Sequence, residues 1–230
     1  MIKKCESCEL RKFGICAVLI GTPPNPESVE HVKHGVIRAR QFLQRDGDKA
    51  GSIKVIRQGW ATSVETTSDG KFLTSEIHVA GDSFGAAFMI EQGVKRNVRA
   101  MTDVEYCSFD VSFVKPLLLS RQDVLDIFIE QTADIIRSLR ARLLDIGTRT
   151  AEQRVISFIV SVHDKLEERG LLKGPKMPFP LRQQDIADAL GLTQVHTNRV
   201  LKNLREKGAF TIEKKEVYVS DVEKIRAMLD

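Results

Sequence analysis

Four cysteines are the residues of this sequence whose type and spacing point most directly to chemistry. Cys5, Cys8 and Cys16 form the pattern C-x2-C-x7-C, and Cys107 follows much later in the chain. Four thiolates can complete a [4Fe–4S] cluster, a [2Fe–2S] cluster or a structural zinc site. A pair of thiols two residues apart also suits a redox switch between dithiol and disulfide. The cysteines therefore predict a metal centre or a redox-active thiol site and leave its nature open.

The composition is that of a packed protein without a membrane segment. Of the 230 residues, 42% are hydrophobic and 29% are charged, and the net charge of +4 permits a polyanionic partner without requiring one. No apolar stretch approaches the roughly 18 residues that a membrane span needs, and residues 17–20 are too short for a signal-peptide core. We therefore expect a cytoplasmic protein with no membrane partner, whose grouped cysteines serve a metal or redox site rather than structural disulfides.

The elements that would position the cysteines begin with a β-rich region. Residues 1–21 contain three of the cysteines, and residues 22–30, with three prolines, are expected to form an irregular connection. Farther along, glycines recur between short segments rich in Val, Ile, Thr and Phe, and Asp69-Gly70 is typical of a hairpin turn. This pattern predicts an antiparallel, jelly-roll-like β-roll over residues 22–118, in a protein of the α+β class.

A long helix is predicted over residues 119–147. Its apolar or small residues recur alternately four and three positions apart, as in a coiled coil: Leu125, Ile129, Thr132, Ile136, Leu139, Leu143 and Ile146. A second apolar set faces elsewhere and is expected to pack on the roll: Val124, Ile127, Phe128 and Ile135. We interpret the first stripe as the interface of a parallel homodimer. The alternative is that both stripes are buried within one chain.

A helix-turn-helix is predicted in the remaining part, residues 148–230. Thr150 can cap a helix over residues 151–169, which is followed by a loop with three prolines. Residues 183–190 are typical of a short helix ended by Gly191, and Thr193 can cap the next helix, which runs to about residue 207. Two helices joined by a short turn containing Gly form this motif. The residues that follow Gly208 predict a two-stranded wing.

The second helix of this motif has two distinct faces. Its core-facing stripe follows the i, i+3, i+4, i+7 spacing: Thr197, Val200, Leu201 and Leu204. The outward face and the start of the helix carry residue types that contact DNA: Thr193, Gln194, Val195, Asn198, Arg199 and Lys202. Arg199 can bind guanine, and Gln194 or Asn198 can bind adenine. Val195 can contact a thymine methyl group, and Thr193 can bind a phosphate.

The charge around this helix agrees with double-stranded DNA as a partner. Residues 182–215 carry seven basic and four acidic side chains. The alternative is an ordinary amphipathic helix pair with a solvated face. The wing and the basic face together favour DNA binding. We find no P-loop, no GxSxG elbow and no HExxH motif, so we do not expect an enzyme.

The order of β-roll, heptad helix and winged helix-turn-helix resembles the Crp–Fnr superfamily of bacterial transcription factors. The most specific stretches are residues 184–205, the AGDSFG segment at 80–85 and the AEQRV segment at 151–155. The resemblance implies a homodimer on a palindromic operator, with RNA polymerase as a further partner if the protein is an activator. It also implies that a signal in the roll alters the dimer helices and hence the spacing of the recognition helices.

The cysteines resemble those of the oxygen-sensing fumarate–nitrate reduction regulators within this superfamily. That branch has three N-terminal cysteines and one in the roll, in a segment like residues 100–107, and the x7 spacing matches its alphaproteobacterial-type variant. The resemblance implies an oxygen- or redox-sensitive [4Fe–4S] cluster on Cys5, Cys8, Cys16 and Cys107. Cyclic AMP is not expected, because residues 86–88 and 95–100 lack the Glu and the Arg-Ser/Thr-Ala phrase of the nucleotide-binding members.

Two departures from that branch affect these expectations. Val195 and Asn198 stand where the branch usually has Glu and Ser, which leaves the operator sequence open. Leu139 is apolar in a region where the branch can carry an acidic residue, so we hypothesise a dimer that persists without the cluster. Other modes of control are a zinc or thiol–disulfide switch and a small-molecule or haem effector in the roll. His31 and His34 near the start of the roll are more simply interpreted as solvated loop histidines.

Overall fold

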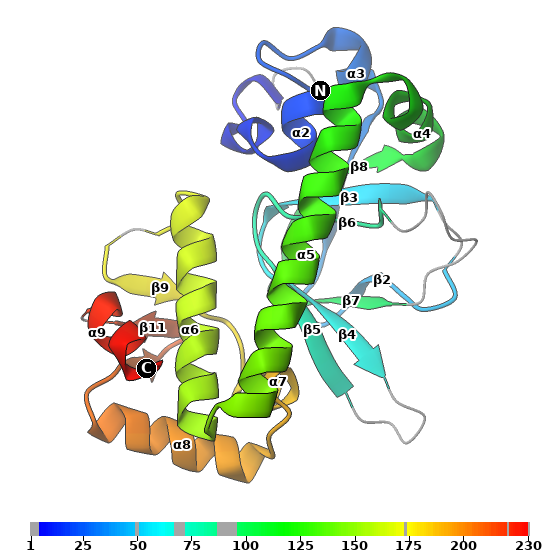
Figure 1. Ribbon diagram of the computed structural model, residues 1–230. Helices are drawn as coiled ribbons and strands as arrows, with labels where there is room; N and C mark the ends of the chain where they lie inside the picture. Colours follow the sequence, from blue (N-terminus) through cyan, green and yellow to red (C-terminus); the bar gives the residue numbers. More distant parts are fainter. Residues whose placement is uncertain are drawn as a thin grey trace. The chain divides into compact units, whose positions relative to one another are not determined.

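The computed structural model describes residues 5–48, 51–66, 72–86, 96–172, 174–219 and 221–229. It contains an antiparallel β-rich N-terminal region, a long helix and a C-terminal helix-turn-helix, which confirms the predicted α+β class (Figure 1). The chain divides into two compact units: Met1–Val64 with His78–Arg137, and Glu65–Ile77 with Ser138–Asp230. No helix among the described residues is long and apolar enough to cross a membrane.

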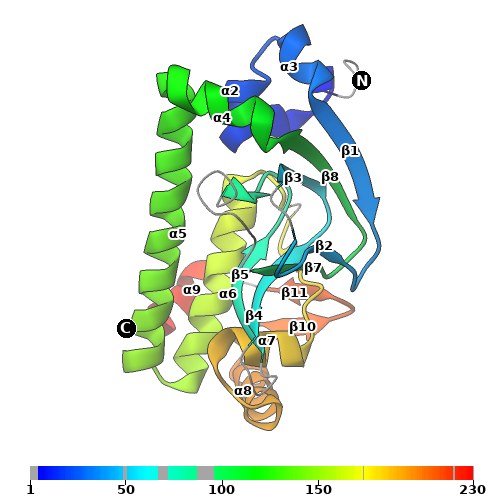
Figure 2. The ribbon, with the colours of Figure 1, turned by 90° about the vertical axis from the view of Figure 1, so that its right-hand side faces the viewer.

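The predicted antiparallel β-roll is present, and its described residues form two four-stranded sheets. The first sheet has the order β1-β8-β3-β6 and contains β1 (Val32–Ile37), β3 (Ser52–Gln58), β6 (Ser83–Phe84) and β8 (Val104–Asp110). The second has the order β2-β7-β4-β5 and contains β2 (Phe42–Gln44), β4 (Ala61–Thr66), β5 (Phe72–His78) and β7 (Asn97–Ala100). Figure 2 shows β1 and β8 side by side as curved, antiparallel strands. The predicted Asp69-Gly70 turn lies outside the described residues.

Strand β3 is buried on both sides, because a hydrophobic cluster lies against each of its faces. Ile56 packs between the two sheets with residues such as Val98 and Val104. Ile53 and Val55 belong to a second cluster, which also contains residues from the N-terminal helices and from the beginning of the long helix. This second cluster is the core on which the cysteine-bearing segment rests.

The N-terminal segment is more helical than predicted. It contains a short 3-10 helix, η1 (Glu9–Lys12), followed by α2 (Gly14–Leu19) and α3 (Pro26–Glu30). The expectation of an irregular connection over residues 22–30 is therefore wrong for α3. Asn25 caps this helix by accepting a hydrogen bond from the Glu27 N–H, and Pro26 suits the first helical position because it needs no N–H partner there.

A second correction concerns the end of the roll. The strand pattern ends at Asp110, and α4 (Val111–Ser120) occupies part of the predicted roll region, with Pro116 inside it. The apolar run of this segment does not distinguish a strand from a helix by itself. Val114 is fully buried, and Phe113 and Leu117 pack partly against the second hydrophobic cluster, so packing at helical spacing decides the conformation.

The long helix α5 spans Gln122–Thr148 and contributes to both units. Its side chains Val124 and Phe128 are buried in the second hydrophobic cluster, and Ile127 packs partly against it. Three members of the second apolar set therefore pack on the N-terminal unit, as predicted, whereas Ile135 is half-buried outside this cluster.

The remainder of the second unit begins with α6 (Ala151–Glu168), α7 (Gln183–Leu190) and α8 (Gln194–Glu206). Thr150 and Gln153 form the capping box that starts α6. The wing strands β10 (Thr211–Glu213) and β11 (Glu216–Tyr218) pair as predicted, and α9 (Val222–Arg226) with η3 (Ala227–Leu229) follows them.

The predicted proline-rich loop contains a third strand, β9 (Lys176–Pro178), which pairs with β11. The sequence pattern misses β9 because three residues are too few to show an alternation. Its conformation is determined by its neighbour: Met177 lies opposite Val217, and both side chains are buried.

Candidate cysteine site and DNA-binding surface

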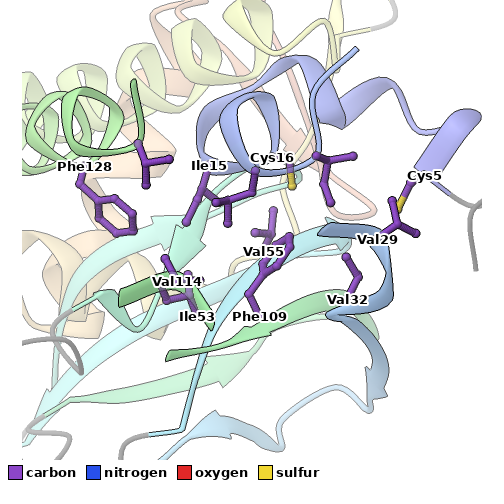
Figure 3. Close-up of a cluster of buried hydrophobic side chains, with 13 residues drawn as sticks. Cys5, Ile15, Cys16, Val29, Val32, Ile53, Val55, Phe109, Val114 and Phe128 are labelled. Atoms are coloured by element: carbon purple, nitrogen blue, oxygen red, sulfur yellow. The ribbon is translucent and has the colours of Figure 1, made fainter. Parts of the chain in front are cut away.

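The four cysteines come from three parts of the first unit: the turn at residues 5–8, α2 and β8. Cys5 and Cys8 flank a turn in which the Cys8 N–H donates to the Cys5 carbonyl at 3.1 Å. Cys16 is on α2 and Cys107 is on β8. All four are free thiols; Cys5 and Cys16 are buried, whereas Cys8 and Cys107 are half-buried. Figure 3 shows the Cys16 sulfur directed from α2 toward the sheet and the Cys5 sulfur beside Val29.

Cys107 lies near the N-terminal cysteines, because it packs against the buried cluster to which Cys5 and Cys16 belong. Burial raises the pKa of Cys16, and the thiols of Cys107, Cys8 and Cys5 raise it further. Burial and then the Cys8 thiol raise the pKa of Cys5, whereas the guanidinium groups of Arg57 and Arg11 lower it. A metal ion would favour the thiolate forms and displace these protons. The fold thus brings together the thiols that the sequence separates.

The four sulfurs are not gathered around a single point. Among the residues that the structure describes, which include all four cysteines, no three of these sulfurs lie within 4.8 Å of one another. Tetrahedral zinc, with Zn–S bonds of about 2.3 Å, would hold its thiolates about 3.8 Å apart. A single zinc ion bound by these thiols would therefore require them to move closer together. Four thiolates also match the ligand number of an iron–sulfur cluster, in which each one binds a different iron.

Two basic side chains border the thiols and were not identified from the sequence as part of the site. The Arg11 guanidinium donates to the Cys5 carbonyl at 3.2 Å and also to the Glu6 carbonyl. His34 Nδ1 lies 3.4 Å from Cys107 Sγ. The interpretation of His34 as a solvated loop residue is wrong, because it lies half-buried in β1. No sequence pattern indicates either contact: Arg11 reaches a carbonyl six residues earlier, and His34 meets Cys107 only because β1 pairs with β8.

The helix-turn-helix has the geometry that its sequence predicts. Gly191 ends α7 in the left-handed conformation, with φ of 64°, and Thr193 caps α8 by accepting a hydrogen bond from the His196 N–H at 3.2 Å. The Thr193 hydroxyl proton remains available to a phosphate oxygen. Thr197, Val200 and Leu204 are buried and Leu201 is half-buried, so this side of α8 faces the core of its domain.

The opposite side of α8 is exposed. The proposed base- and phosphate-contacting residues all lie on it or at its start: Thr193, Gln194, Val195, Asn198, Arg199 and Lys202. Val195 is 81% exposed, an unusual position for an apolar side chain with no partner. Next to this face is a hollow of about 270 Å³, bordered by Gln183 of α7, by Lys202 and Arg205 of α8, and by Ile212 of β10. The arrangement offers cations and amide groups on one surface, as a DNA-binding helix requires.

The heptad stripe of α5 is uncovered in the single chain. Its large apolar side chains beyond Leu125 are between 44% and 72% exposed: Ile129, Ile136, Leu139, Leu143 and Ile146. Leu125 is half-buried, and the exposed Thr132 directs its hydroxyl to the Phe128 carbonyl. Such a row of exposed apolar residues marks an interaction surface.

A β-roll next to a thiol site, a long helix with an apolar stripe and a winged helix-turn-helix define a DNA-binding regulator with a sensor domain. Residues 153–228 match the family model of the Crp-like helix-turn-helix domain, and residues 35–121 match that of the cyclic nucleotide-binding domain. The chain belongs to the Crp–Fnr family of transcription regulators.

Relatives with known names agree with this assignment. The chain is 26% identical to the transcriptional activator protein FnrL of Cereibacter sphaeroides, over 96% of this chain and 90% of FnrL. It is 22% identical to the transcriptional activator protein Anr of Pseudomonas aeruginosa, over 94% of this chain and 88% of Anr. The structure of FixK2 from Bradyrhizobium japonicum is similar in fold, with a TM-score of 0.77 and 20% identity over 85% of this chain and 96% of that one. These relatives confirm the prediction that the chain is not an enzyme.

The match to the cyclic nucleotide-binding domain describes the fold of the roll. The expectation that cyclic AMP is not the effector depends on residues 86–88 and 95–100, and residues 87–95 lie outside the described part of the chain. That expectation stays a prediction.

Proposed function

We propose that this protein is a cytoplasmic, homodimeric transcription activator that responds to oxygen or redox state through a [4Fe–4S] cluster held by Cys5, Cys8, Cys16 and Cys107. The observation that carries the proposal is that Cys107, far away in the sequence, packs against the buried cluster that contains Cys5 and Cys16. The names of FnrL and Anr support activation, with RNA polymerase as a partner. We divide the chain into a cysteine segment (1–21), a sensor (22–118), a dimerisation helix (119–147) and a DNA-binding domain (148–230).

The residues around the thiols would control access to the site. A bound [4Fe–4S] cluster supplies iron and sulfide that O2 or NO can attack. Cys16 and Cys5 are buried, so the protein shields one side, whereas the half-buried Cys8 and Cys107 leave the other side within reach of small molecules. A cluster bound by all four cysteines would also link residues 5–16 to β8. This link would be lost when the cluster is lost.

The cysteine segment is packed directly on the beginning of α5. Ile15 and Leu19 of α2 share one buried cluster with Val124 and Phe128 of α5. The Arg121 guanidinium, just before α5, donates to the Val18 carbonyl at 3.0 Å. Release of the thiols would loosen α2 against these partners, because α2 carries both Cys16 and the packing residues. We propose that this is how the state of the site reaches the dimer helix.

A second contact couples the same segment to α5 and to the roll. Gln131 of α5 accepts a hydrogen bond from the Ser83 hydroxyl at 2.9 Å. A Cβ atom added to Gly14, the first residue of α2, would lie 2.8 Å from Gln131 Nε2. The Gln131 amide can move aside, so the positive φ of Gly14, 51°, is what favours glycine at this close approach of α2 to Gln131. A shift of α2 would thus change the surroundings of Gln131, which directly precedes Thr132 of the heptad stripe.

DNA binding is assigned to α8 and its surroundings. In a twofold dimer, two copies of α8 would read the two halves of a palindromic site. We assign base contacts to Gln194, Val195, Asn198 and Arg199, and phosphate contacts to Thr193 and Lys202. The dimer interface is assigned to the heptad stripe of α5, whose exposure in the single chain supports pairing.

Metal and sulfide analysis under anaerobic conditions tests the proposal. The purified protein is expected to hold about four iron and four sulfide per chain, with broad visible absorbance that air removes. Cys107→Ser should lose most of the iron while its operator-binding domain stays folded. Stoichiometric zinc without iron, or a Cys107→Ser protein that keeps its full iron content, would contradict the proposal. Neither a haem nor a small-molecule effector in the roll is favoured by any contact among the described residues.

A further inference from the structure

The strand pairing of the roll places a polar residue directly opposite Cys107. On β8, Cys107 lies opposite His34 of β1 on one side and opposite Val55 of β3 on the other. Val55 is buried and apolar, so of these two register partners only His34 can form a hydrogen bond. His34 Nδ1 lies 3.4 Å from Cys107 Sγ, within the usual range for a contact to sulfur.

The direction of this hydrogen bond follows from the chemistry of a metal ligand. A coordinated cysteine is a thiolate, which accepts hydrogen bonds and has no proton to donate. The proton between the two atoms must therefore be carried by Nδ1. We propose that His34 donates a hydrogen bond from Nδ1 to the Cys107 thiolate and acts as a positioning residue that slows loss of the cluster. This inference rests on the proposed function, because it assigns a role in the same site.

Two physical effects would follow from the N–H to sulfur contact. A donor to the sulfur withdraws electron density from the thiolate, and hydrogen bonds to sulfur are among the factors that raise the reduction potential of iron–sulfur sites. The contact also fixes the orientation of the Cys107 side chain, as outer hydrogen bonds do for metal ligands generally. Both effects act on Cys107, the proposed ligand that links the cysteine segment to the roll. His34 is therefore placed to influence the rate at which this ligand is lost.

The chain offers a matched control three residues away. His31 is exposed and stacks on Phe113, with ring centroids 4.0 Å apart, so it carries the same side chain in contact with an aromatic ring. His34→Leu removes the donor. His34→Asn keeps a donor, because the Asn Nδ2 group occupies the place of the imidazole Nδ1. His31→Leu removes an imidazole near the same strand and leaves His34 in place.

The experiment compares wild type with these three variants after anaerobic cluster reconstitution. The rate of absorbance loss in air and the rate of iron transfer to a chelator under anaerobic conditions are measured. His34→Leu is expected to lose iron about tenfold faster than wild type, in line with other outer hydrogen bonds to metal ligands. His34→Asn and His31→Leu should stay near the wild-type rates. If His34→Leu does not fold, His34→Phe replaces it, since Phe fills the ring volume without a donor.

Equal iron-loss rates for wild type and His34→Leu would overturn the inference while leaving the cluster in place. An Asn variant as fast as the Leu variant would also overturn it, because the role of His34 would then be packing rather than donation. A wild-type protein without iron would be a failure of the proposed function itself, and the wild-type iron content alone distinguishes this outcome.

Discussion

Cys16 on α2 and Cys107 on β8 lie far apart in the sequence but influence each other in the folded chain. Burial raises the pKa of the Cys16 thiol, and Cys107 is the neighbouring thiol that raises it most. The interaction requires α2 to rest on the sheet that contains β8. One buried cluster, formed by α2 residues such as Ile15 and Leu19 with Phe109 of β8, holds these two elements together.

The raised pKa of Cys16 predicts slow alkylation of this thiol in the metal-free protein. Alkylating reagents attack the thiolate, and at pH 8 the folded chain holds less Cys16 thiolate than a cysteine with the ordinary pKa of 9.0. We expect folded Cys16 to be alkylated at least about tenfold more slowly than the same residue in urea, since one pKa unit is tenfold in thiolate. Peptide mapping after timed labelling measures both rates, and equal rates would contradict the burial of this thiol.

The raised pKa of Cys16 also predicts how the stability of the metal-free protein changes with pH. The unfolded chain releases the Cys16 proton near the ordinary pKa of 9.0, whereas the folded chain keeps it to higher pH because its pKa is raised. The contribution of Cys16 to stability is therefore complete below pH 9 and is lost as pH rises above it. Urea unfolding at a series of pH values should show a steeper alkaline loss for wild type than for Cys16→Ala.

Arg11 is expected to hold the turn that presents Cys5 and Cys8. Its guanidinium binds the carbonyls of Cys5 and Glu6, and hydrogen bonds to charged groups contribute about 1.5–3 kcal/mol. Arg11→Leu should therefore lower iron retention about tenfold under a chelator. The neighbouring Lys12 forms only an exposed ion pair with Glu9, so Lys12→Leu serves as the control and should behave like wild type. Equal iron retention in the two variants would count against a role for Arg11.

Arg199 and Lys202 are expected to affect DNA binding in different ways. Arg199→Ala should weaken operator binding by about 1–3 kcal/mol and relax the preference at one base pair, because the guanidinium would contact a base. Lys202→Ala should weaken binding to all sequences, because the ammonium would contact a phosphate. It should also reduce the slope of log K against log salt concentration by about one.

Fluorescence anisotropy with operator and scrambled duplexes at several salt concentrations measures both DNA-binding effects. Lys224→Ala, an exposed lysine on α9, provides the matched control. Arg199 and Lys202 variants indistinguishable from this control would show that α8 does not contact DNA through these residues.

Leu143 is expected to be central to the dimer interface. It is 72% exposed in the single chain, so Leu143→Glu should leave the monomer fold intact. In a dimer, the new carboxylate would be buried without a partner at a cost of about 3–5 kcal/mol, more than about 100-fold in the dimer Kd. Ala141→Glu is the control, because exposed Ala141 lies about 200° around the helix from Leu143. Sedimentation of both variants measures the association, and a dimeric Leu143→Glu would rule out this interface.

The absence of charged residues from the stripe, Leu125, Ile129, Thr132, Ile136, Leu139, Leu143 and Ile146, also predicts that association does not depend on the cluster. Leu139 adds no charge repulsion to the interface. The wild-type protein stripped of metal is therefore expected to sediment as a dimer at micromolar concentration. A monomer under these conditions would show that the cysteine site controls dimerisation itself.

The sequence by itself determined the elements whose signals are local. Gly191 and Thr193 end one helix and begin the next through their own backbone and hydroxyl groups, so the helix-turn-helix could be predicted from a few neighbouring residues. The capping box of Thr150 and Gln153 is local in the same sense. The four cysteines could be recognised as a set because their residue type is rare and their chemistry is specific.

Only the tertiary structure decided the features that depend on distant partners. Residues 111–120 form a helix and residues 176–178 form a strand because of what Val114 and Met177 pack against, which short apolar segments do not encode. The contact between His34 and Cys107 arises from the antiparallel register of β1 and β8. A shift of one residue would turn either side chain to the other face of the sheet. The sequence therefore identifies the thiols, and the register of the roll determines which groups surround them.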